Sequence, residues 1–409
     1  MWLLDKALRR VLHRGQLTVT DHKGRAHHYG APDAELRPVA VRFADRRVPG
    51  QIARDPGLGA AETYMDGRLI LEQGDILDLV TLIRRNSRWE DKDPGQRSFL
   101  RQGGKLKNGL DRLNWRRRSR SNVAHHYDIG NQLYELFLDA DMQYSCAYFA
   151  DPANSLEQAQ LDKKAHIAAK LALKPGQRVL DIGCGWGGMA LYLNRVADVE
   201  VLGITLSEEQ LRTARERAAA AGVADKVRFE LIDYRDVTGR FDRIVSVGMF
   251  EHVGPPQYRT FFRKCRDLLT DDGVMLLHTI GRMGRPGTTD AFMQKYIFPG
   301  GYIPALSETL VASEHERLIM TDCETLRFHY YHTIRHWYDR TAAQRDEIVR
   351  RFDERLHRLW LFYLAAAMTM FTESNMVNYQ IQYARRRDAL PMTRNYMLSD
   401  ETRLQTILT

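Results

Sequence analysis

A glycine-rich loop between a buried strand and a helix constrains this chain more than any other feature. Residues 178–182 (RVLDI) are a short apolar run typical of a buried strand, and Gly183, Gly185 and Gly187 follow directly. Glycines in such a loop let the backbone turn sharply and let a ligand approach without obstruction by a Cβ atom. The loop predicts a nucleotide-binding α/β domain, but alone it does not separate a methyltransferase from a dinucleotide-dependent dehydrogenase.

The residues around the loop alternate between strand and helix patterns. In chain order, the sequence predicts a helix at about 187–197, a strand at 199–204, a helix that begins after the N-cap Ser207, strands at 227–232 and 243–247, a helix at about 256–269 and a strand at 274–277. This alternation predicts a parallel, doubly wound Rossmann-like sheet, and ligands bind such sheets at the carboxyl ends of the strands.

Composition divides the chain into a smaller N-terminal domain, residues 1–120, and a catalytic domain, residues 121–409. The first ends in a basic stretch, residues 101–120, with eight Lys or Arg residues against Asp111 alone. This stretch is either a solvated linker or a patch for an anionic lipid surface. We expect the N-terminal domain to be mainly helical and to bind membrane lipid. We expect the catalytic domain to hold an acyl-chain pocket and to be mostly helical from about residue 321.

The net charge of +8 favours a polyanionic partner, although charge alone does not choose between nucleic acid and phospholipid. Near the N-terminus, an apolar helical face opposes a basic one and suits either a membrane surface or packing on its own domain; its apolar residues are Leu4, Leu8, Val11 and Leu12. The longest apolar run, residues 360–371, is shorter than the roughly 20 residues needed to cross a bilayer. It predicts a buried helix.

The four cysteines are widely spaced and form no CxxC pair, which indicates a reducing compartment and no zinc ribbon. The N-terminus also lacks the pattern of a signal peptide. We therefore expect a cytoplasmic protein, associated peripherally with the inner face of the cell membrane.

The ends of the second and third predicted strands favour one cofactor class. A dinucleotide enzyme typically places an acid about 20 residues after the glycines, at the end of the second strand. Here that strand is followed by Thr205, and the first acid is Glu208. Thr205 and Gln210 offer hydrogen bonds to a ligand, and Tyr234, after the third strand, offers a flat face to an adenine ring. Together these residues favour S-adenosylmethionine over NAD.

Several blocks resemble the cyclopropane-fatty-acyl-phospholipid synthases and the related mycolic acid cyclopropane synthases. They are GLGAAETYMDGRL (57–69), HYDIGN (126–131), MQYSCAY (142–148), VLDIGCGWGG (179–188), ITLSEEQ (204–210), FDRIVSVGMFEHVG (241–254), LLHTIG (276–281) and KYIFP (295–299). The MQYSCAY block and the GMFEHVG segment are far more specific than the glycine loop. Residues 1–50 and the tail from about 385 show no such match.

Because His278, Glu251 and Cys184 show no metal-ligand spacing, we expect no metal. The resemblance implies a class I methyltransferase-like α/β fold that uses S-adenosylmethionine and bicarbonate. It implies that the cofactor is bound by Tyr144, Ser145, Asp181, Gly183, Gly185, Gly187, Thr205, Gln210, Tyr234 and Arg235. It further implies that bicarbonate is held by Cys146, Glu251, His278, the backbone of Ile280 and a tyrosine, either Tyr330 or its neighbour Tyr331.

The implied reaction transfers a methylene group from S-adenosylmethionine to the cis double bond of an unsaturated phospholipid acyl chain. The alkene takes the methyl group, and the resulting carbocation closes a ring when bicarbonate removes a proton. The resemblance also suggests a homodimer at an anionic membrane surface and no nucleic-acid partner. Each site residue also has a structural alternative: Glu251 as a helix cap, and His278, Tyr330 and Cys146 as core residues.

Four other functions remain open from the sequence. The nearest is a lipid methyltransferase on the same scaffold, whose product is methyl-branched or a methylated unsaturated chain. An NAD-dependent oxidoreductase would use the glycine loop differently. A nucleic-acid methyltransferase is disfavoured, because the middle of the chain lacks an Asn/Asp-Pro-Pro-Tyr or Pro-Cys motif. The last is a lipid-binding protein without catalytic activity.

Overall fold

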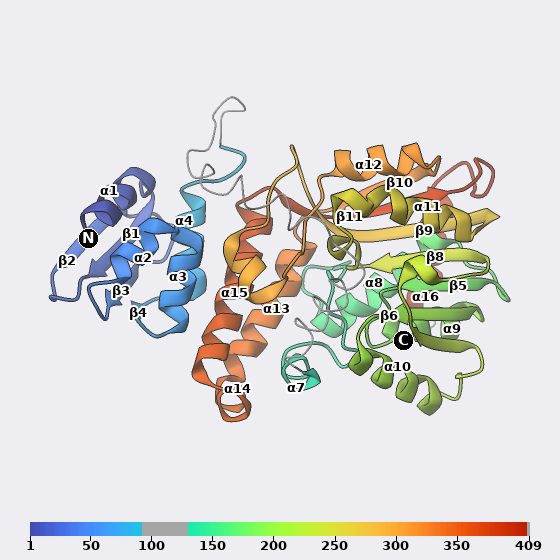
Figure 1. Ribbon diagram of the computed structural model, residues 1–409, viewed down its shortest axis with the longest axis horizontal. Coiled ribbons are helices and arrows are strands. Elements are labelled where there is room, and N and C mark those ends of the chain that lie inside the picture. Colours follow the sequence, from blue (N-terminus) through green and yellow to red (C-terminus); the bar gives the residue numbers. More distant parts are fainter. Residues whose placement is uncertain (92–129, 407–409) are drawn as a thin grey trace. The chain divides into compact units, whose positions relative to one another are not determined.

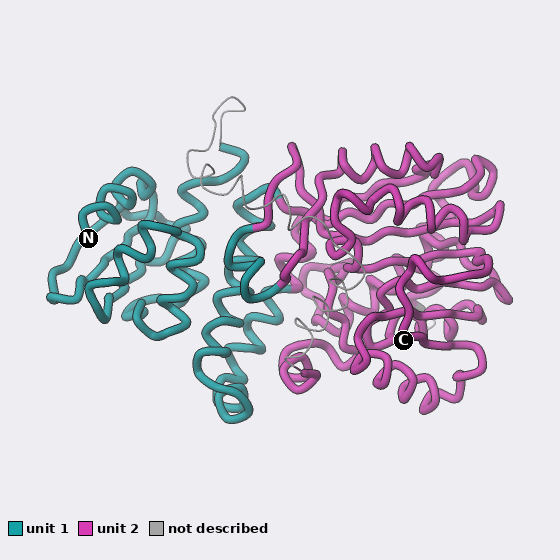
Figure 2. Tube along the Cα trace, viewed as in Figure 1, with its two compact units in different colours: residues 1–103, 290–297, 334–375 teal, residues 104–289, 298–333, 376–409 magenta. Residues whose placement is uncertain are grey.

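The computed structural model describes residues 1–91 and 130–406, and the chain forms two compact units (Figure 2). Among the described residues, unit 1 comprises 1–91, 290–297 and 334–375, and unit 2 comprises the remainder. The expected boundary at residue 120 and the basic stretch 101–120 lie outside the described residues. The division differs from a single cut, because the helices of residues 334–375 join the N-terminal residues in unit 1. There, the long helix α15 (Glu354–Thr372) packs against α3 (Pro56–Met65) and α4 (Ile76–Arg85).

Unit 2 is built on a seven-stranded sheet with the order β10-β11-β9-β8-β5-β6-β7 (Figure 1). Its strands are β5 (Arg178–Ile182), β6 (Glu200–Thr205), β7 (Val227–Leu231), β8 (Phe241–Val247), β9 (Leu269–Arg282), β10 (Ile319–Leu326) and β11 (Met376–Ala384). The pairs among β5 to β9 are parallel, whereas β11 runs antiparallel to both β9 and β10.

Helices cover both faces of this sheet, which confirms the predicted doubly wound fold. Val179 and Val245 pack with α8 (Leu156–Leu171), α9 (Gly188–Ala197), α10 (Glu208–Ala220) and α16 (Asn395–Thr406). The neighbouring Leu180 and Ile244 point the other way, toward α11 (Tyr258–Leu268) and α12 (Leu306–His315). This alternation along each strand separates two apolar clusters on opposite faces. Ser207 is the N-cap of α10, as the sequence predicts, and its side chain accepts a hydrogen bond from the backbone N–H of Gln210.

The predicted strands β5 to β9 are all present, but β10 and β11 are not predicted by the sequence. Every residue of β11 is buried, yet one of its sides is polar, with Asn378, Gln380 and Gln382 at alternate positions. A central strand usually reads as a continuous apolar run, and this one does not. The remaining elements of unit 2 include α7 (Asn131–Tyr134) and the start of α13 (His329–Ala343).

Unit 1 contains a four-stranded sheet, in addition to its expected helices, with the order β2-β1-β3-β4. Its other elements are α1 (Trp2–Val11), β1 (Gly15–Thr20), β2 (Ala26–Ala31), β3 (Val39–Phe43), α2 (Val48–Arg54), α3 (Pro56–Met65), β4 (Leu69–Gln73), α4 (Ile76–Arg85) and α14 (Arg345–Arg351). The sequence does not predict this sheet.

The apolar face of α1 packs on its own unit, which decides between the two alternatives for that face. Leu4 and Leu12 are buried in the unit 1 core with Leu17 and Val41. The predicted buried helix at residues 360–371 is also present, within α15, where Trp360 and Leu364 are fully buried. Across residues 1–91 and 130–406, no helix is both long and apolar enough to cross a membrane.

Candidate active site

A cavity opens at the carboxyl ends of β5, β6 and β8 in unit 2, where the sheet topology predicts a ligand. Nine of the ten predicted cofactor-binding residues line it: Tyr144, Ser145, Asp181, Gly183, Gly185, Thr205, Gln210, Tyr234 and Arg235. Segments far apart in the sequence therefore meet in one place. The cavity is also lined by Met142, Gln143, Trp186, Asp233, Met249 and His252. Sequence reasoning did not assign these a role, although several lie inside the motifs that carry the family resemblance.

The glycines of the loop have different surroundings. Gly185 has φ of 54°, and no atom lies within 4 Å of the position where a Cβ would stand, so its backbone is open to the cavity. Gly187, the tenth predicted residue, does not line the cavity. With φ of 85°, it precedes α9, and a Cβ there would lie 2.7 Å from Cζ of Phe229. The requirement for glycine at 187 therefore comes from close packing and backbone conformation.

The ends of β6 and β7 present ordered polar groups to the cavity. The hydroxyl of Thr205 donates to Oε1 of Gln210 over 2.9 Å, which joins the strand end to α10. Arg235 is held by Asp233 through two side-chain hydrogen bonds of 2.8 and 2.6 Å. Tyr234 meets Phe261 edge-on, with 5.4 Å between ring centroids. These contacts fix the side chains at the rim before a ligand binds.

Residues 143–145 form one wall of the cavity, and α8 holds them through two polar side chains. Gln160 donates from Nε2 to the carbonyl oxygens of Gln143 and Ser145, over 3.2 and 3.0 Å. Lys163 donates from Nζ to Oε1 of Gln143 over 2.6 Å and to Oγ of Ser145 over 2.9 Å. A lysine in a charged run normally faces solvent, so the sequence gives no signal for this role.

Burial dominates the electrostatics behind this wall. Lys163 is fully buried, which lowers the pKa of its ammonium group to about 8. Burial likewise raises the pKa of Asp181 to about 7, with the charge of Lys163 opposing the rise. Oδ2 of Asp181 is buried and, among the described residues, has no hydrogen-bond partner. The charge of Lys163 also acts on the pKa of both Cys146 and His278, so these groups share one neighbourhood.

Glu251 and Ile280, two of the predicted catalytic residues, are in direct contact. Oε1 of Glu251 accepts a hydrogen bond of 2.6 Å from the backbone N–H of Ile280. The other carboxyl oxygen, Oε2, is buried and has no hydrogen-bond partner in the described part of the chain. Burial raises the pKa of Glu251 to about 7. At neutral pH this carboxyl group is therefore protonated in much of the population and has a proton to donate.

His278 precedes Ile280 by two residues on β9, so both side chains are on the same face of the sheet. Its ring is buried, which lowers its pKa well below the usual value and keeps the imidazole neutral. Its Nδ1 lies 3.1 Å from the amide of Gln380, and its Nε2 lies 3.0 Å from the amide of Asn378. Both contacts are to amide nitrogens, which donate, and a neutral imidazole accepts at only one ring nitrogen. The remaining ring N–H therefore needs an amide oxygen, and Oδ1 of Asn378, which has no other partner among the described residues, can supply it when that amide is reversed. Both ring nitrogens therefore already have partners on β11.

Cys146 and Tyr330 lie on facing segments of unit 2. Thr333, one helical turn after Tyr330 on α13, accepts a hydrogen bond of 3.0 Å at Oγ1 from the backbone N–H of Ala147. Residues three apart share a helix face, so Tyr330 rather than the half-exposed Tyr331 is directed toward this segment. Tyr330 is buried, and burial raises the pKa of the Cys146 thiol. This thiol is uncharged at neutral pH, which disfavours a nucleophilic role.

None of the five predicted catalytic residues lines the cavity directly. Their neighbours do: Ser145 precedes Cys146, and Gly248 donates its backbone N–H to the carbonyl oxygen of His278 over 2.9 Å. Within residues 1–91 and 130–406, no three His, Cys, Asp or Glu side chains gather as a metal site. Residues 126–129 of the HYDIGN block lie outside the described residues.

The strand order, the antiparallel β11 and a cavity at the carboxyl ends of the central strands define a class I S-adenosylmethionine-dependent methyltransferase. A solved structure of the same class is a mycolic acid cyclopropane synthase, CmaA1, in complex with S-adenosylhomocysteine and CTAB. It superposes with a TM-score of 0.62 at 31% identity, over 66% of this chain and 99% of that one. Residues 114–381 match the mycolic acid cyclopropane synthetase family, and the chain belongs to this family.

Curated relatives agree with the assignment. A cyclopropane-fatty-acyl-phospholipid synthase of Escherichia coli K12 is 39% identical over 349 residues, which cover 85% of this chain and 88% of the relative. A probable fatty acid methyltransferase of Pseudomonas putida is 36% identical over 374 residues, covering 88% and 91%. The predicted family, fold class and use of S-adenosylmethionine are therefore confirmed, and the chain is a lipid-modifying enzyme.

Proposed function

We propose that this enzyme transfers a methylene group from S-adenosylmethionine to the cis double bond of an unsaturated phospholipid acyl chain and forms a cyclopropane ring. The similarity to the Escherichia coli enzyme, over most of both chains, supports the substrate class and the product. The cavity, lined by nine residues expected to bind the cofactor, supports the position of the methyl donor. When bound, S-adenosylmethionine supplies an electrophilic methyl group and bicarbonate supplies the base for the proton that ring closure releases.

The proposal depends on Oε2 of Glu251, which is buried and has no hydrogen-bond partner within residues 1–91 and 130–406. Two anions repel, so a bound bicarbonate is favoured beside this group only when the carboxyl is protonated. Because burial raises the pKa of Glu251 to about 7, that protonated form is available at neutral pH. The carboxyl donates from Oε2 while the backbone N–H of Ile280 holds Oε1, so Glu251 offers a hydrogen bond in a fixed direction.

The other predicted residues contribute a buried environment from which water is excluded. His278, Cys146 and Tyr330 are all buried, and a carbocation survives long enough to lose a proton only where water is excluded. His278 contributes to binding an anion only if one ring nitrogen exchanges its partner on β11, either Asn378 or Gln380. We therefore assign the main hydrogen bond to Glu251 and a secondary one to His278.

We further propose that the enzyme works as a peripheral protein at the cytoplasmic face of the membrane, with unit 1 in contact with lipid. Two large apolar residues at the start of α1 support this contact, since Trp2 is 73% exposed and Leu3 is 63% exposed. They are followed by basic residues, among them Lys6 and Arg10, which suit an anionic surface. The homodimer and the acyl-chain pocket rest on the family resemblance alone.

A methyl-branched or methylated unsaturated product is the second candidate. The Pseudomonas putida relative, described as a probable fatty acid methyltransferase, matches more of this chain than the Escherichia coli synthase does. Such a product forms only if the carbocation loses a different proton or is reduced. The two candidates share every residue of the cofactor cavity, so only analysis of the product separates them.

The test is to incubate the full-length protein with vesicles of an unsaturated phospholipid and methyl-labelled S-adenosylmethionine, with and without added bicarbonate. We expect labelled lipid that gains one CH2 group, resists mild hydrogenation and forms faster with bicarbonate. A labelled product that takes up hydrogen would establish the methyltransferase instead. If no label reaches the lipid although the protein binds S-adenosylmethionine, the lipid substrate is wrong.

A further inference from the structure

Unit 1 has a hollow on its surface, which we call the arginine hollow, where β3 leads into α2. It is lined by Asp45, Arg46, Arg47, Gly50, Gln51, Arg54 and Arg68. Four guanidinium groups thus face a single carboxylate. Nothing in the proposed reaction uses these residues, and all of them belong to unit 1.

The carboxylate of Asp45 is already engaged by one of the four arginines. Arg68 donates from Nε to Oδ2 of Asp45 over 2.7 Å and from Nη2 to Oδ1 over 3.0 Å. Its Nη1 donates to Oε1 of Gln51 over 2.6 Å. The guanidinium of Arg68 holds the pKa of Asp45 well below its usual range, so this ion pair is present throughout the physiological range. Arg68 is therefore fixed as one wall of the hollow.

The other three arginines differ from Arg68 in this respect. Arg46, Arg47 and Arg54 are exposed, and none of the described carboxylates pairs with their guanidinium groups. Three like charges around one hollow repel each other, and an anion between them would offset this repulsion.

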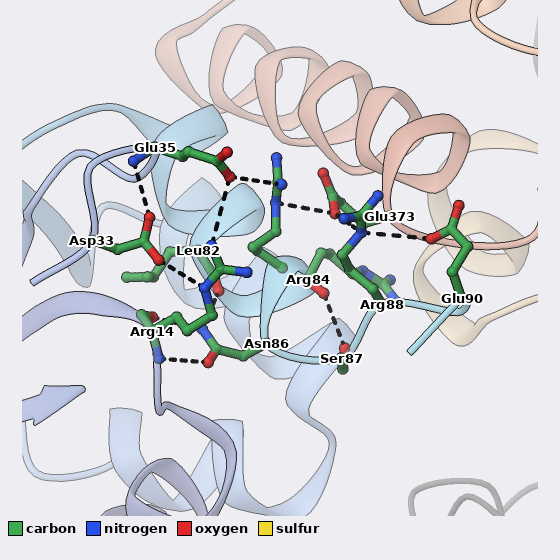
Figure 3. A network of polar contacts seen from close by, with 11 residues as sticks. Arg14, Asp33, Glu35, Leu82, Arg84, Asn86, Ser87, Arg88, Glu90 and Glu373 are labelled. Carbon is green, nitrogen blue, oxygen red and sulfur yellow. Dashed lines mark hydrogen bonds and ion pairs between the residues drawn. The ribbon is translucent and has the colours of Figure 1, made fainter. Parts of the chain in front are cut away.

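Other arginines of unit 1 do have acidic partners. Figure 3 shows a network at the end of α4 in which arginines face carboxylates. Arg14 pairs with Asp33 over 2.7 Å, and Glu373 lies 3.2 Å from Nε of both Arg85 and Arg88. Arg14, Arg85 and Arg88 thus have acidic partners. Arg46, Arg47 and Arg54 of the arginine hollow have none among the described residues, so their charges are available to a ligand.

The shape and chemistry of the hollow indicate which anion it suits. Guanidinium groups form paired hydrogen bonds with the oxygens of phosphate groups, and several together match a tetrahedral anion better than ammonium groups do. At Gly50, no atom lies within 4 Å of the position that a Cβ would take, so this side of the hollow stays open. We propose that the arginine hollow binds a phosphate group, either of a phospholipid headgroup at a membrane surface or of a free phosphorylated molecule.

This assignment rests on the residues of unit 1 and not on the proposed ring closure, so the two fail separately. With a phospholipid as the source, the hollow would hold unit 1 at the headgroup layer. With a free phosphorylated molecule as the source, it would be a ligand site apart from the cofactor cavity. Labelled-lipid formation tests the reaction, and phosphate binding by the variants below tests the hollow.

The experiment compares two charge-matched double variants of the full-length protein. R47Q/R54Q removes two arginines of the hollow. R25Q/R37Q removes two exposed arginines of the same unit that do not line it and whose guanidinium groups have no acidic partner among the described residues. Binding of inorganic phosphate is measured by calorimetry at physiological salt, with thermal melting to confirm that both variants fold.

We expect R47Q/R54Q to bind inorganic phosphate about ten-fold more weakly than the wild type, because hydrogen bonds to charged groups are lost. R25Q/R37Q should keep wild-type affinity. Absence of phosphate binding in the wild type, or equal losses in the two variants, would overturn the proposal.

A second measurement separates the two sources of phosphate. Both variants are tested for co-sedimentation with phosphatidylglycerol vesicles. A selective loss of vesicle binding in R47Q/R54Q identifies the phospholipid headgroup as the ligand. Retained vesicle binding together with weakened inorganic phosphate binding identifies a free phosphorylated molecule. Either result supports the phosphate site, and only the calorimetric outcomes above reject it.

Discussion

Glu251 and His278 in unit 2 are buried ionisable groups, whereas Arg46, Arg47 and Arg54 in unit 1 are exposed ones. Burial shifts both groups of unit 2 toward their uncharged forms, raising the pKa of Glu251 to about 7 and lowering that of His278. The three arginines are instead exposed to water. The two regions therefore offer opposite environments to an anion.

This difference in burial indicates how each region would bind its ligand. A group in the buried region would hydrogen-bond its ligand in an uncharged form, because charge there is stable only when it is compensated. The arginine hollow attracts an anion from solution by its net charge, and salt screens that attraction. Substitutions that remove charge should consequently have large effects in the first region and moderate effects in the second.

The largest effect is expected from Glu251→Ala. Loss of the carboxyl removes the hydrogen-bond donor at the proposed anion site, and product formation should fall by about 100-fold or more. Binding of S-adenosylmethionine should stay near the wild-type level, because Glu251 does not line the cofactor cavity. Product formation is measured with labelled cofactor, and E230A, which changes an exposed glutamate of β7, is the control. Turnover near the wild-type rate in E251A would reject the assigned role.

The pH dependence of stability gives a second test of the buried carboxyl. The folded-state pKa of Glu251 is about 7, above the ordinary value of 4.5, so the folded state binds the proton more tightly than the unfolded state. The wild type should therefore lose stability as pH rises from 4.5 to 7, by about 3 kcal/mol relative to E251Q, which does not titrate there. Urea unfolding of both proteins in bicarbonate-free buffer measures this difference. A constant difference across that range would show that Glu251 is not buried as described.

A smaller effect is expected from Lys163→Met, which tests a buried cation against the exposed arginines. The substitution leaves Oε1 of Gln143 and Oγ of Ser145 without their donor, so the cavity wall loosens. The affinity for S-adenosylmethionine should fall on the order of ten-fold. The exposed K174M and the hollow variant R47Q/R54Q should both keep wild-type affinity. Equal affinities in all four proteins would mean that α8 does not position the wall.

Local patterns predicted the centre of unit 2 well. The run RVLDI gives β5, the glycines give the turn after it, and Ser207 gives the N-cap of α10, because each depends on residues close together in the sequence. The same locality explains why nine residues that line the cavity could be named in advance, since they follow strand ends or lie in specific motifs. The surroundings of Gly187 could not be predicted in this way, because they depend on the side chain of Phe229, which is distant in the sequence.

Long-range contacts account for what the sequence did not predict. Strand β11 lies between β9 and β10, which are far from it in the chain, and its polar residues are buried by partners such as His278 and Lys170. The discontinuous unit 1 likewise joins α15 to helices near the N-terminus. No local pattern encodes such a pairing.

The sequence by itself determined the parallel strands, the glycine turn and the family to which this enzyme belongs. Only the tertiary structure decided which charged residues are buried and which carboxyl oxygen has no partner. Lys163 and Arg54 are both cations on helices, yet one is fully buried and the other exposed. The free energy of a charge depends on the solvent and the charges that folding places around it, and these come from residues distant in the chain.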